Sequence, residues 1–161
     1  IENERMKFMI KIKKLTEDAI IPHNSREGDA CFDLYTRKDC VILAKSKDIV
    51  PTGIAMQLTK DLEAEIRPRS GISLKGLECK HFGIDETVIA DIDVIQGTID
   101  SNYRGEINII LRNNSSHDIV IPRYTKLAQM KINCVPEVEF IEVEELSDSN
   151  RGANGFGSSG I

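Results

Sequence analysis

Glycine and proline divide the sequence into many short apolar stretches, and this division favours a β-rich fold. In the 62–66 stretch, for example, apolar residues occupy every second position, at Leu62, Ala64 and Ile66. Helical spacing of apolar residues is not sustained anywhere in the chain, and only 72–77 suggests a short helix. Strands are expected at 6–12, 32–35, 40–44, 49–58, 62–66, 106–112, 119–121, 127–132 and 138–143. The pattern therefore predicts an all-β, jelly-roll-like barrel with one short helix.

Length and composition favour a single domain with an aliphatic core. The chain has 161 residues, of which 40% are hydrophobic and only 5% aromatic, and it has no tryptophan. We expect the barrel to span residues 6–146 and a mobile C-terminal arm to span 147–161. Residues 1–5 precede the regular pattern and are interpreted as a tag or an upstream extension. An all-β domain of this kind often completes its core by oligomerising.

Charge and cysteine usage restrict the partners and the compartment. A net charge of −5 argues against direct nucleic-acid binding, which needs a basic face. No apolar run approaches the roughly 20 residues that cross a bilayer, so no membrane partner is expected. The four cysteines lack zinc-site spacing, and the Cys79/His81 pair is interpreted as structural. Reduced thiols predict a cytoplasmic protein, or one of the nucleus or host-cell interior if it is eukaryotic or viral.

The segment 97–106 carries the strongest chemical signal. It begins at Gly97 after an apolar approach, places Asp100 and Tyr103 near a tip, and continues as a strand from Ile107. This arrangement predicts a β-hairpin whose unpaired backbone groups can recognise the edge of a pyrimidine. A carboxylate beside such a hairpin can orient and deprotonate a water molecule. The alternative for this segment alone is an ordinary turn capped by Asp100.

Three further segments carry polar groups, and the first of them suggests a place for phosphate. Arg69, Ser70 and Gly71 follow a proline and open the short helix, where backbone N–H groups and a guanidinium can hold an anion. The alternative is a plain helix start with a solvated arginine. Asp33 lies in an apolar strand and must face water, a cation or a metal-bound water, because unpaired burial is costly. Gln129 places an amide in another apolar strand.

The last eleven residues form an unusual tail. Residues 151–161 contain four glycines and two serines together with Arg151 and Phe156. Glycine lets N–H groups converge on a small anion, arginine offers a fork for phosphate oxygens, and an aromatic ring can cover a base. The alternative is a flexible glycine/serine end or an expression scar.

In this order, these segments resemble the homotrimeric deoxyuridine triphosphate nucleotidohydrolase (dUTPase) family from Met6 onward. The matching segments are 30–34, 68–71, 97–106, 127–129 and 151–160. The resemblance implies a homotrimer that uses Mg²⁺ and hydrolyses dUTP to dUMP and pyrophosphate. This reaction limits uracil incorporation into DNA and supplies dUMP for dTMP synthesis.

The resemblance also implies roles for residues of the 97–108 segment. Its backbone would distinguish uracil from cytosine and leave no space for the methyl group of thymine. Tyr103 would pack beneath the sugar and exclude a ribose 2′-hydroxyl, and Asp100 would orient the water that attacks the α-phosphorus in line. The other substrate contacts implied here are Gly97, Thr98, Ile99 and Asn108.

Phosphate and metal roles are implied for the remaining motifs. The phosphates would be held by Arg69, Ser70, Gly71 and Gln129, often from a neighbouring subunit. Mg²⁺ would be held by the triphosphate, and Asp33 would reach it only through water. In the arm, Arg151 would meet the γ-phosphate and Phe156 would stack on uracil. Gly157, Ser158 and Ser159 would cradle the phosphates as the arm closes the site.

Two features depart from the family pattern. The fourth motif begins with Tyr124-Thr125-Lys126 where the family often has Gly-Asp-Arg, so its turn is not implied. The segment 76–91 is an insertion relative to compact members and is interpreted as a surface loop beside the site. The alternative function is therefore a dUTP-sensing regulatory or interaction protein that uses the 76–91 insertion. A third possibility, dCTP deamination, is disfavoured because Asp100 stands at the water position.

Overall fold

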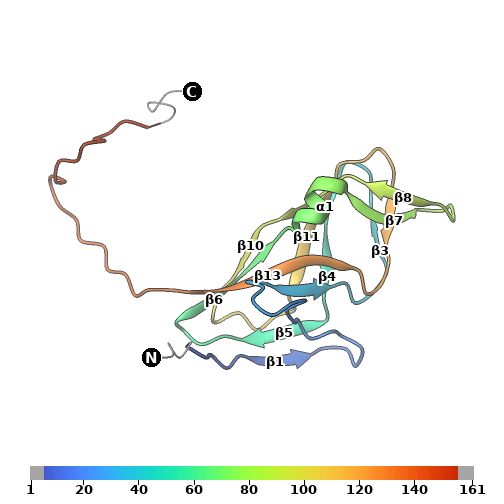
Figure 1. Ribbon diagram of the computed structural model, residues 1–161, viewed down its shortest axis with the longest axis horizontal. Coiled ribbons are helices and arrows are strands. Elements are labelled where there is room, and N and C mark those ends of the chain that lie inside the picture. The colour runs from blue at the N-terminus through green and yellow to red at the C-terminus, as the bar shows by residue number, and fades with distance from the viewer. Residues whose placement is uncertain (1–5, 156–161) are drawn as a thin grey trace.

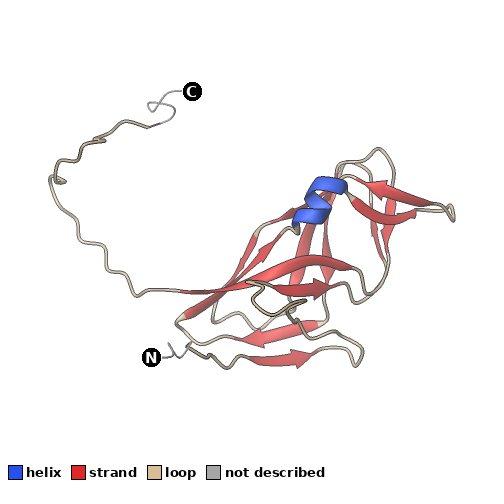
Figure 2. Cartoon of the chain, viewed as in Figure 1, coloured by secondary structure: helices blue, strands red, loops and turns tan. Residues whose placement is uncertain are grey.

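The structure, a computed structural model, describes residues 6–155, which form a β-barrel with one short helix and a long C-terminal extension (Figures 1 and 2). All strand pairs are antiparallel. The elements are β1 (Lys11–Lys14), β2 (Phe32–Tyr35), β3 (Cys40–Ile42), β4 (Lys47–Pro51), β5 (Ile54–Gln57), β6 (Leu62–Arg67), α1 (Ser70–Lys75), β7 (Leu77–His81), β8 (Thr87–Ala90), β9 (Ile92–Ile95), β10 (Gly97–Ile99), β11 (Asn108–Asn113), β12 (Ile119–Ile121) and β13 (Lys126–Cys134). The predicted all-β fold with one short helix is confirmed.

Four sheets enclose the core. Their strand orders are β1-β5, β10-β6-β13-β2, β4-β11-β9 and β3-β12-β7-β8. Isoleucine, leucine and valine side chains fill the space between the sheets, as the low aromatic content predicts. Leu62, Ala64 and Ile66 are buried on one face of β6, so the alternation in the sequence corresponds to the core face of a strand. The helix α1 lies at one end of the barrel (Figure 2).

The predicted 49–58 strand is interrupted at Gly53. Its φ of +76° lies in the left-handed region, where a side chain is strained. A Cβ at this position would lie 3.0 Å from the Thr16 hydroxyl and 3.1 Å from Cδ of Arg37. The chain therefore turns between β4 and β5 at a residue that only glycine suits.

The insertion at 76–91 is not a surface loop, as predicted, but a β-hairpin. Strands β7 and β8 pair from Leu77 opposite Ala90 to Lys80 opposite Thr87. The hairpin extends the β3-β12 pair because His81 also lies opposite Ile119. Leu77, Cys79 and Ala90 contribute buried side chains, and this burial explains why the segment is built into a sheet.

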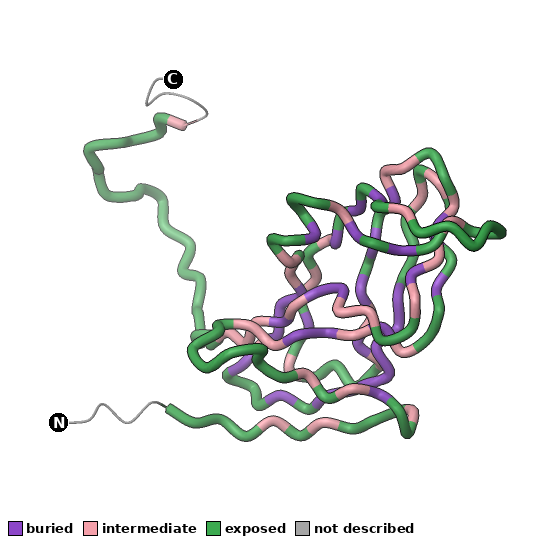
Figure 3. Tube along the Cα trace, turned by 45° about the vertical axis from the view of Figure 1, so that its right-hand side comes forward, coloured by how far each residue is buried: buried purple, intermediate pink, exposed green. Residues whose placement is uncertain are grey.

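The C-terminal part leaves the barrel after β13. Residues 135–155 run away from the sheets as an extended, exposed chain (Figures 1 and 3). The predicted strand at 138–143 is wrong for the chain alone, because this described segment pairs with no other part of residues 6–155. Its apolar side chains are consequently exposed, with Phe140 95% and Ile141 77% accessible. Among the described residues, no helix has the length and apolar character needed to cross a membrane.

Candidate active site

The 97–108 loop forms one wall of a cavity. Strand β10 pairs with β6, whereas β11 lies between β4 and β9, so the strands that flank the loop belong to different sheets. The predicted hairpin is therefore a loop between sheets. Its turn is closed by the Tyr103 N–H, which donates to the Asp100 carbonyl at 3.1 Å. The Tyr103 hydroxyl donates to the Glu106 carbonyl at 2.9 Å.

Contacts from the β4–β5 turn fix the outgoing end of this loop. The Ile107 N–H donates to the Ile54 carbonyl at 2.8 Å, and the Thr52 hydroxyl donates to the Ile107 carbonyl at 2.6 Å. The Glu106 carboxylate accepts a hydrogen bond from the Gly53 N–H at 2.9 Å. These bonds order the loop before any ligand binds, which lowers the entropy cost of recognition.

We call the cavity beside this loop the loop pocket. It has a volume of about 270 Å³. The structure places six of the predicted site residues in its wall, which are Gly97, Thr98, Ile99, Asp100, Tyr103 and Asn108. Ile49, Ile66 and Ile110 complete the apolar wall. Sequence reasoning missed these three, because a strand isoleucine that lines a pocket has the same pattern as one that lines a core.

A second, more polar cavity of about 700 Å³, the polar pocket, lies beside β2, α1 and β13. The structure brings Asp33, Arg69, Ser70, Gly71 and Gln129 to its wall, as the sequence analysis grouped them. The Arg69 guanidinium donates to the Lys126 carbonyl at 2.9 Å, and the Gln129 amide donates to the Pro68 carbonyl at 3.0 Å. Both side chains are therefore held by backbone of the neighbouring element.

Asp33 is the electrostatic centre of the polar pocket. Its side chain is 11% exposed and lies 3.2 Å from Nζ of Lys126 and 3.9 Å from Nε of Arg69. The Ser25 hydroxyl also donates to it. Burial alone would raise the pKa of this carboxyl, but the hydrogen bonds from Ser25 and Lys126 and the two nearby positive charges outweigh it. The net effect lowers the pKa of Asp33, so the group is an anion near neutral pH.

Lys126 and Ser25 belong to this pocket although sequence reasoning did not assign them a role. Nζ of Lys126 donates to the Ser25 hydroxyl at 2.9 Å while it pairs with Asp33. Lys126 therefore supplies a cation to the wall of the polar pocket. Its position in the sequence, directly before the Leu127-Ala128-Gln129 segment, was the signal that could have identified it.

The two pockets have no lining residue in common within one chain. The loop pocket is lined by Asp100 and Tyr103. The polar pocket is lined by Arg69 and by the other barrel residues that the sequence analysis assigned to phosphate binding. The predicted site residues of the barrel therefore form two groups. Each group is ordered by its own contacts.

The arm carries the remaining predicted residues. The guanidinium of Arg151 donates to the Asn154 carbonyl at 2.8 Å, so a local turn orders this position. The arm runs away from the barrel that bears both pockets (Figure 1). Phe156, Gly157, Ser158 and Ser159, which the sequence analysis also assigned to the site, lie outside the described residues.

Comparison with known proteins identifies the family and the fold. The dUTPase family model matches residues 17–96 and 82–160. The chain belongs to the dUTPase family. It is 41% identical over 154 residues to the deoxyuridine 5′-triphosphate nucleotidohydrolase of Clostridioides difficile, with 96% of this chain and 99% of that protein covered. It is 42% identical to the enzyme of the same name from Clostridium acetobutylicum, with 94% and 97% covered.

Solved dUTPase structures share the fold. The dUTPase of Staphylococcus bacteriophage 80alpha, solved with dUpNHpp, superposes with a TM-score of 0.80 at 23% identity and covers 96% of this chain and 100% of its own. The dUTPase of phage phi11 of S. aureus superposes with a TM-score of 0.71 at 21% identity and covers 88% and 100%. At these identities the superpositions support the dUTPase fold and nothing more specific.

Proposed function

We propose that this dUTPase-family protein hydrolyses dUTP to dUMP and pyrophosphate, and so limits uracil in DNA and supplies dUMP. The observation that carries the proposal is the ordered 97–108 loop, which places Asp100 and Tyr103 on one cavity. The names of the relatives at 41% and 42% identity support the same activity.

The loop pocket suits a pyrimidine nucleoside. Its backbone groups are fixed before binding, so they accept and donate in a set pattern along the edge of uracil. Cytosine presents the opposite pattern at that edge and would leave buried backbone groups unpaired, which is costly. The isoleucines Ile49, Ile66 and Ile110 offer an apolar surface to the base and the sugar.

Asp100 is placed to act on water. Its carboxylate is exposed at the rim of the loop pocket and follows directly after β10. In the proposed step, Asp100 accepts a proton from a water molecule whose oxygen bonds to the α-phosphorus. The bond from the α-phosphorus to the bridging oxygen of the leaving pyrophosphate breaks in line with that attack. The products are dUMP and pyrophosphate.

The polar pocket supplies phosphate binding. Arg69, Ser70, Gly71 and Gln129 offer a guanidinium, a hydroxyl, backbone N–H groups and an amide to the polyphosphate. Asp33 holds Lys126 and Arg69 in place through charge. This positioning leaves less conformational entropy to lose when the anion binds.

The polar pocket also fits Mg²⁺ in one limited sense. Among residues 6–155, no group of three or more His, Cys, Asp or Glu side chains converges on a point, so the protein alone offers no metal cage. Mg²⁺ keeps much of its water and binds phosphate oxygens readily, so a phosphate pocket with the carboxylates of Asp29 and Asp33 in its wall suits it. Asp33 would reach the ion through water. The ion would neutralise charge on the triphosphate.

The arm is proposed to close over bound substrate. The barrel would comprise residues 6–146 and the arm 147–161. Arg151 would meet the γ-phosphate, with Phe156 on the base and Gly157, Ser158 and Ser159 around the phosphates. Support comes from residues 147–155, the described part of the arm, which make no strand pair with the barrel.

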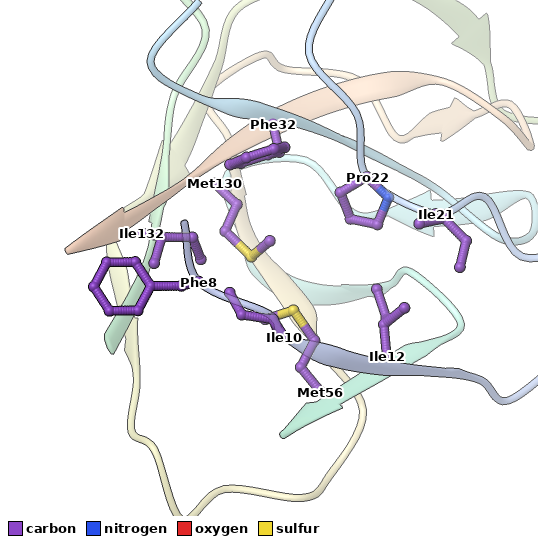
Figure 4. A pocket seen from close by; sticks show the side chains of 9 residues that line it. All are labelled: Phe8, Ile10, Ile12, Ile21, Pro22, Phe32, Met56, Met130 and Ile132. Atoms are coloured by element: carbon purple, nitrogen blue, oxygen red, sulfur yellow. The ribbon is translucent and has the colours of Figure 1, made fainter. Parts of the chain in front are cut away.

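We propose that the protein is a homotrimer in which sites form between copies. The two separate pockets of one chain would each complete a site with the other pocket of a neighbour. An apolar cavity of about 250 Å³ beside β1 is lined by Phe8, Ile10 and Met130 among others (Figure 4). The apolar-rich segment 138–143, which has no strand partner within residues 6–155, is suited to such a cavity on a second copy.

Charge and cysteine state agree with this assembly and its setting. The exposed 137–148 segment is rich in Glu and Asp, whereas β1 and its approach carry Lys7, Lys11 and Lys13. Opposite charges of this kind favour contact between the arm of one copy and β1 of another. All four cysteines are free thiols, which suits the reducing cytoplasm.

The alternative function, a dUTP-sensing regulatory protein that uses the 76–91 insertion, is not favoured. The insertion is tied into a sheet through β12 and supplies buried core residues, so its structure is explained by the fold. The dCTP deamination reading also gains no support.

The test is pyrophosphate release from dUTP, compared with dTTP, dCTP and UTP. We expect turnover of dUTP alone to be rapid, and Asp100→Asn to reduce kcat by at least about a hundredfold because the water loses its base. Asp61→Asn, an exposed carboxylate outside both pockets, is the matched control. Unchanged activity of Asp100→Asn would rule out the proposed water activator.

A further inference from the structure

The side chain of Tyr103 folds back over Gly105. Its hydroxyl donates to the carbonyl of Glu106, three residues ahead, at 2.9 Å, so the side chain and the intervening backbone enclose residue 105. A Cβ on Gly105 would lie 2.6 Å from Cζ of the tyrosine ring and 3.0 Å from Cε2. Neither separation is compatible with the present ring position.

The backbone at Gly105 does not itself require glycine. The glycines with left-handed φ in the described part of the chain are Gly28, Gly53, Gly76, Gly83 and Gly152. Gly105 has an ordinary φ, and the three nearest atoms to a Cβ at this position all belong to the Tyr103 side chain. The φ of residue 105 therefore does not exclude alanine, and the closest conflict of its Cβ would be with the Tyr103 side chain.

We propose that Gly105 is a positioning residue that sets sugar selectivity by leaving room for the Tyr103 ring. This inference rests on the proposed hydrolysis of dUTP and on the role of Tyr103 beneath the sugar. Tyr103 is 44% exposed and lines the loop pocket together with Asp100. Its hydroxyl is held by the bond to Glu106, and the side chain occupies the space that a Cβ at residue 105 would fill.

The contacts of the loop predict which property changes. A methyl group at 105 would displace the ring and break the Tyr103–Glu106 bond. The base-reading backbone is anchored separately, through Ile107 to Ile54 and Thr52. Displacement therefore takes the ring from the position in which Tyr103 is proposed to exclude a 2′-hydroxyl, while the backbone proposed to face the base keeps these anchors. Sugar discrimination should fall while base discrimination stays.

A double-mutant cycle tests this separation. We would measure kcat/KM for dUTP, UTP and dCTP with the full-length protein, Gly105→Ala, Tyr103→Ala and the double variant. We expect Gly105→Ala to lower the dUTP/UTP ratio roughly ten- to hundredfold, the range by which a pocket discriminates one small group. The dUTP/dCTP ratio should stay within about twofold of the unmodified protein. In the Tyr103→Ala background, Gly105→Ala should have no further effect.

Tyr103→Phe examines the same contact without a change at residue 105. It removes the bond to Glu106 but keeps the ring, so the dUTP/UTP ratio should fall less than in Gly105→Ala. Binding of dUMP and UMP, measured by calorimetry, gives the sugar preference without turnover. Urea unfolding of each variant reports on folding separately.

Three outcomes would overturn the inference. They are an unchanged dUTP/UTP ratio in Gly105→Ala, an equal loss of base and sugar discrimination, and an undiminished effect of Gly105→Ala in the Tyr103→Ala background. Failure of the proposed function differs from all three, because the unmodified protein itself would then release no pyrophosphate from dUTP.

Discussion

The guanidinium Nε of Arg37 lies 3.0 Å from the carboxylate of Glu106. The same carboxylate accepts a hydrogen bond from the Gly53 backbone N–H. The backbone N–H of Arg37 donates to the Pro51 carbonyl at 3.0 Å. One acidic side chain therefore ties the 97–108 loop to the segment after β2 and to the β4–β5 turn. Because the pair is only partly exposed, the surrounding protein limits its screening by water.

Replacing Glu106 with Gln should reduce activity more than stability. The amide can still accept from Gly53, but the ion pair with Arg37 is lost, so the loop becomes less ordered before substrate binds. We expect kcat/KM for dUTP to fall about tenfold and the free energy of unfolding to fall by about 1 kcal/mol. Steady-state kinetics and urea unfolding would measure the two effects.

Glu86→Gln is the matched control for this variant. Glu86 is exposed on the β7–β8 hairpin and lines neither pocket. An equal effect of both substitutions on kcat/KM would contradict a role for the Arg37–Glu106 pair in ordering the loop.

The lowered pKa of Asp33 predicts a specific dependence of stability on pH. A carboxyl whose pKa is lower in the folded state stabilises the fold above its unfolded pKa, and this contribution is lost as pH falls through the folded value. Asp33→Asn should therefore be less stable than the unmodified protein by about 2 kcal/mol at pH 7. The difference should shrink below about pH 4, where the unfolded carboxyl is protonated.

Urea unfolding of both proteins between pH 7 and pH 3 would measure that difference. Asp61→Asn, which alters an exposed carboxylate, should change stability little at any pH. A stability difference for Asp33→Asn that stays constant with pH would mean that the charge of Asp33 is not the source of its contribution.

Truncation after Ser149 should separate folding from turnover. The described arm residues make no strand pair with the barrel, so their removal takes little from the core. We expect the free energy of unfolding to change by less than about 0.5 kcal/mol. Turnover should fall at least about a hundredfold because site closure and Arg151 are lost. Loss of folding on truncation would show instead that the arm is part of the folded unit.

The sequence predicts the strands whose pattern is set by burial within one chain. Alternation in β6 corresponds to a buried face. The predicted 49–58 strand is instead divided by a turn at Gly53, where Thr16 and Arg37 lie too close for a larger side chain. The segment 138–143 is also rich in strand-type apolar residues, but it has no strand partner among residues 6–155. The residue pattern of a segment can predict a strand, but it does not identify the strand with which that segment pairs.

The site shows a similar division. Residues that lie close together in the sequence, such as Asp100 and Tyr103, can be grouped by their motif before the fold is known. Lys126 and Ser25 meet at Asp33 only because β13 pairs with β2 and the 22–31 segment folds beside them. The separation of the loop pocket from the polar pocket is likewise a result of strand order.

Mixing two inactive variants tests whether sites form between copies. Asp100→Asn damages the loop pocket and Arg69→Ala damages the polar pocket, and each alone should have little activity. If a site takes its loop from one copy and its polar pocket from the next, random trimers co-folded from urea contain some intact sites. In an equal mixture, about half of the copies have an unaltered loop pocket and the other half have an unaltered polar pocket. A site needs one of each, so about a quarter of full activity should return.

The control mixes Asp100→Asn with a chain that carries both substitutions. No intact loop pocket exists in that mixture, so no activity should return. Pyrophosphate release and light scattering, which should give three chains per particle, would be measured on the same samples. A trimer without recovered activity would show that both halves of a site come from one chain, and the closed arm would then have to bring the two pockets together.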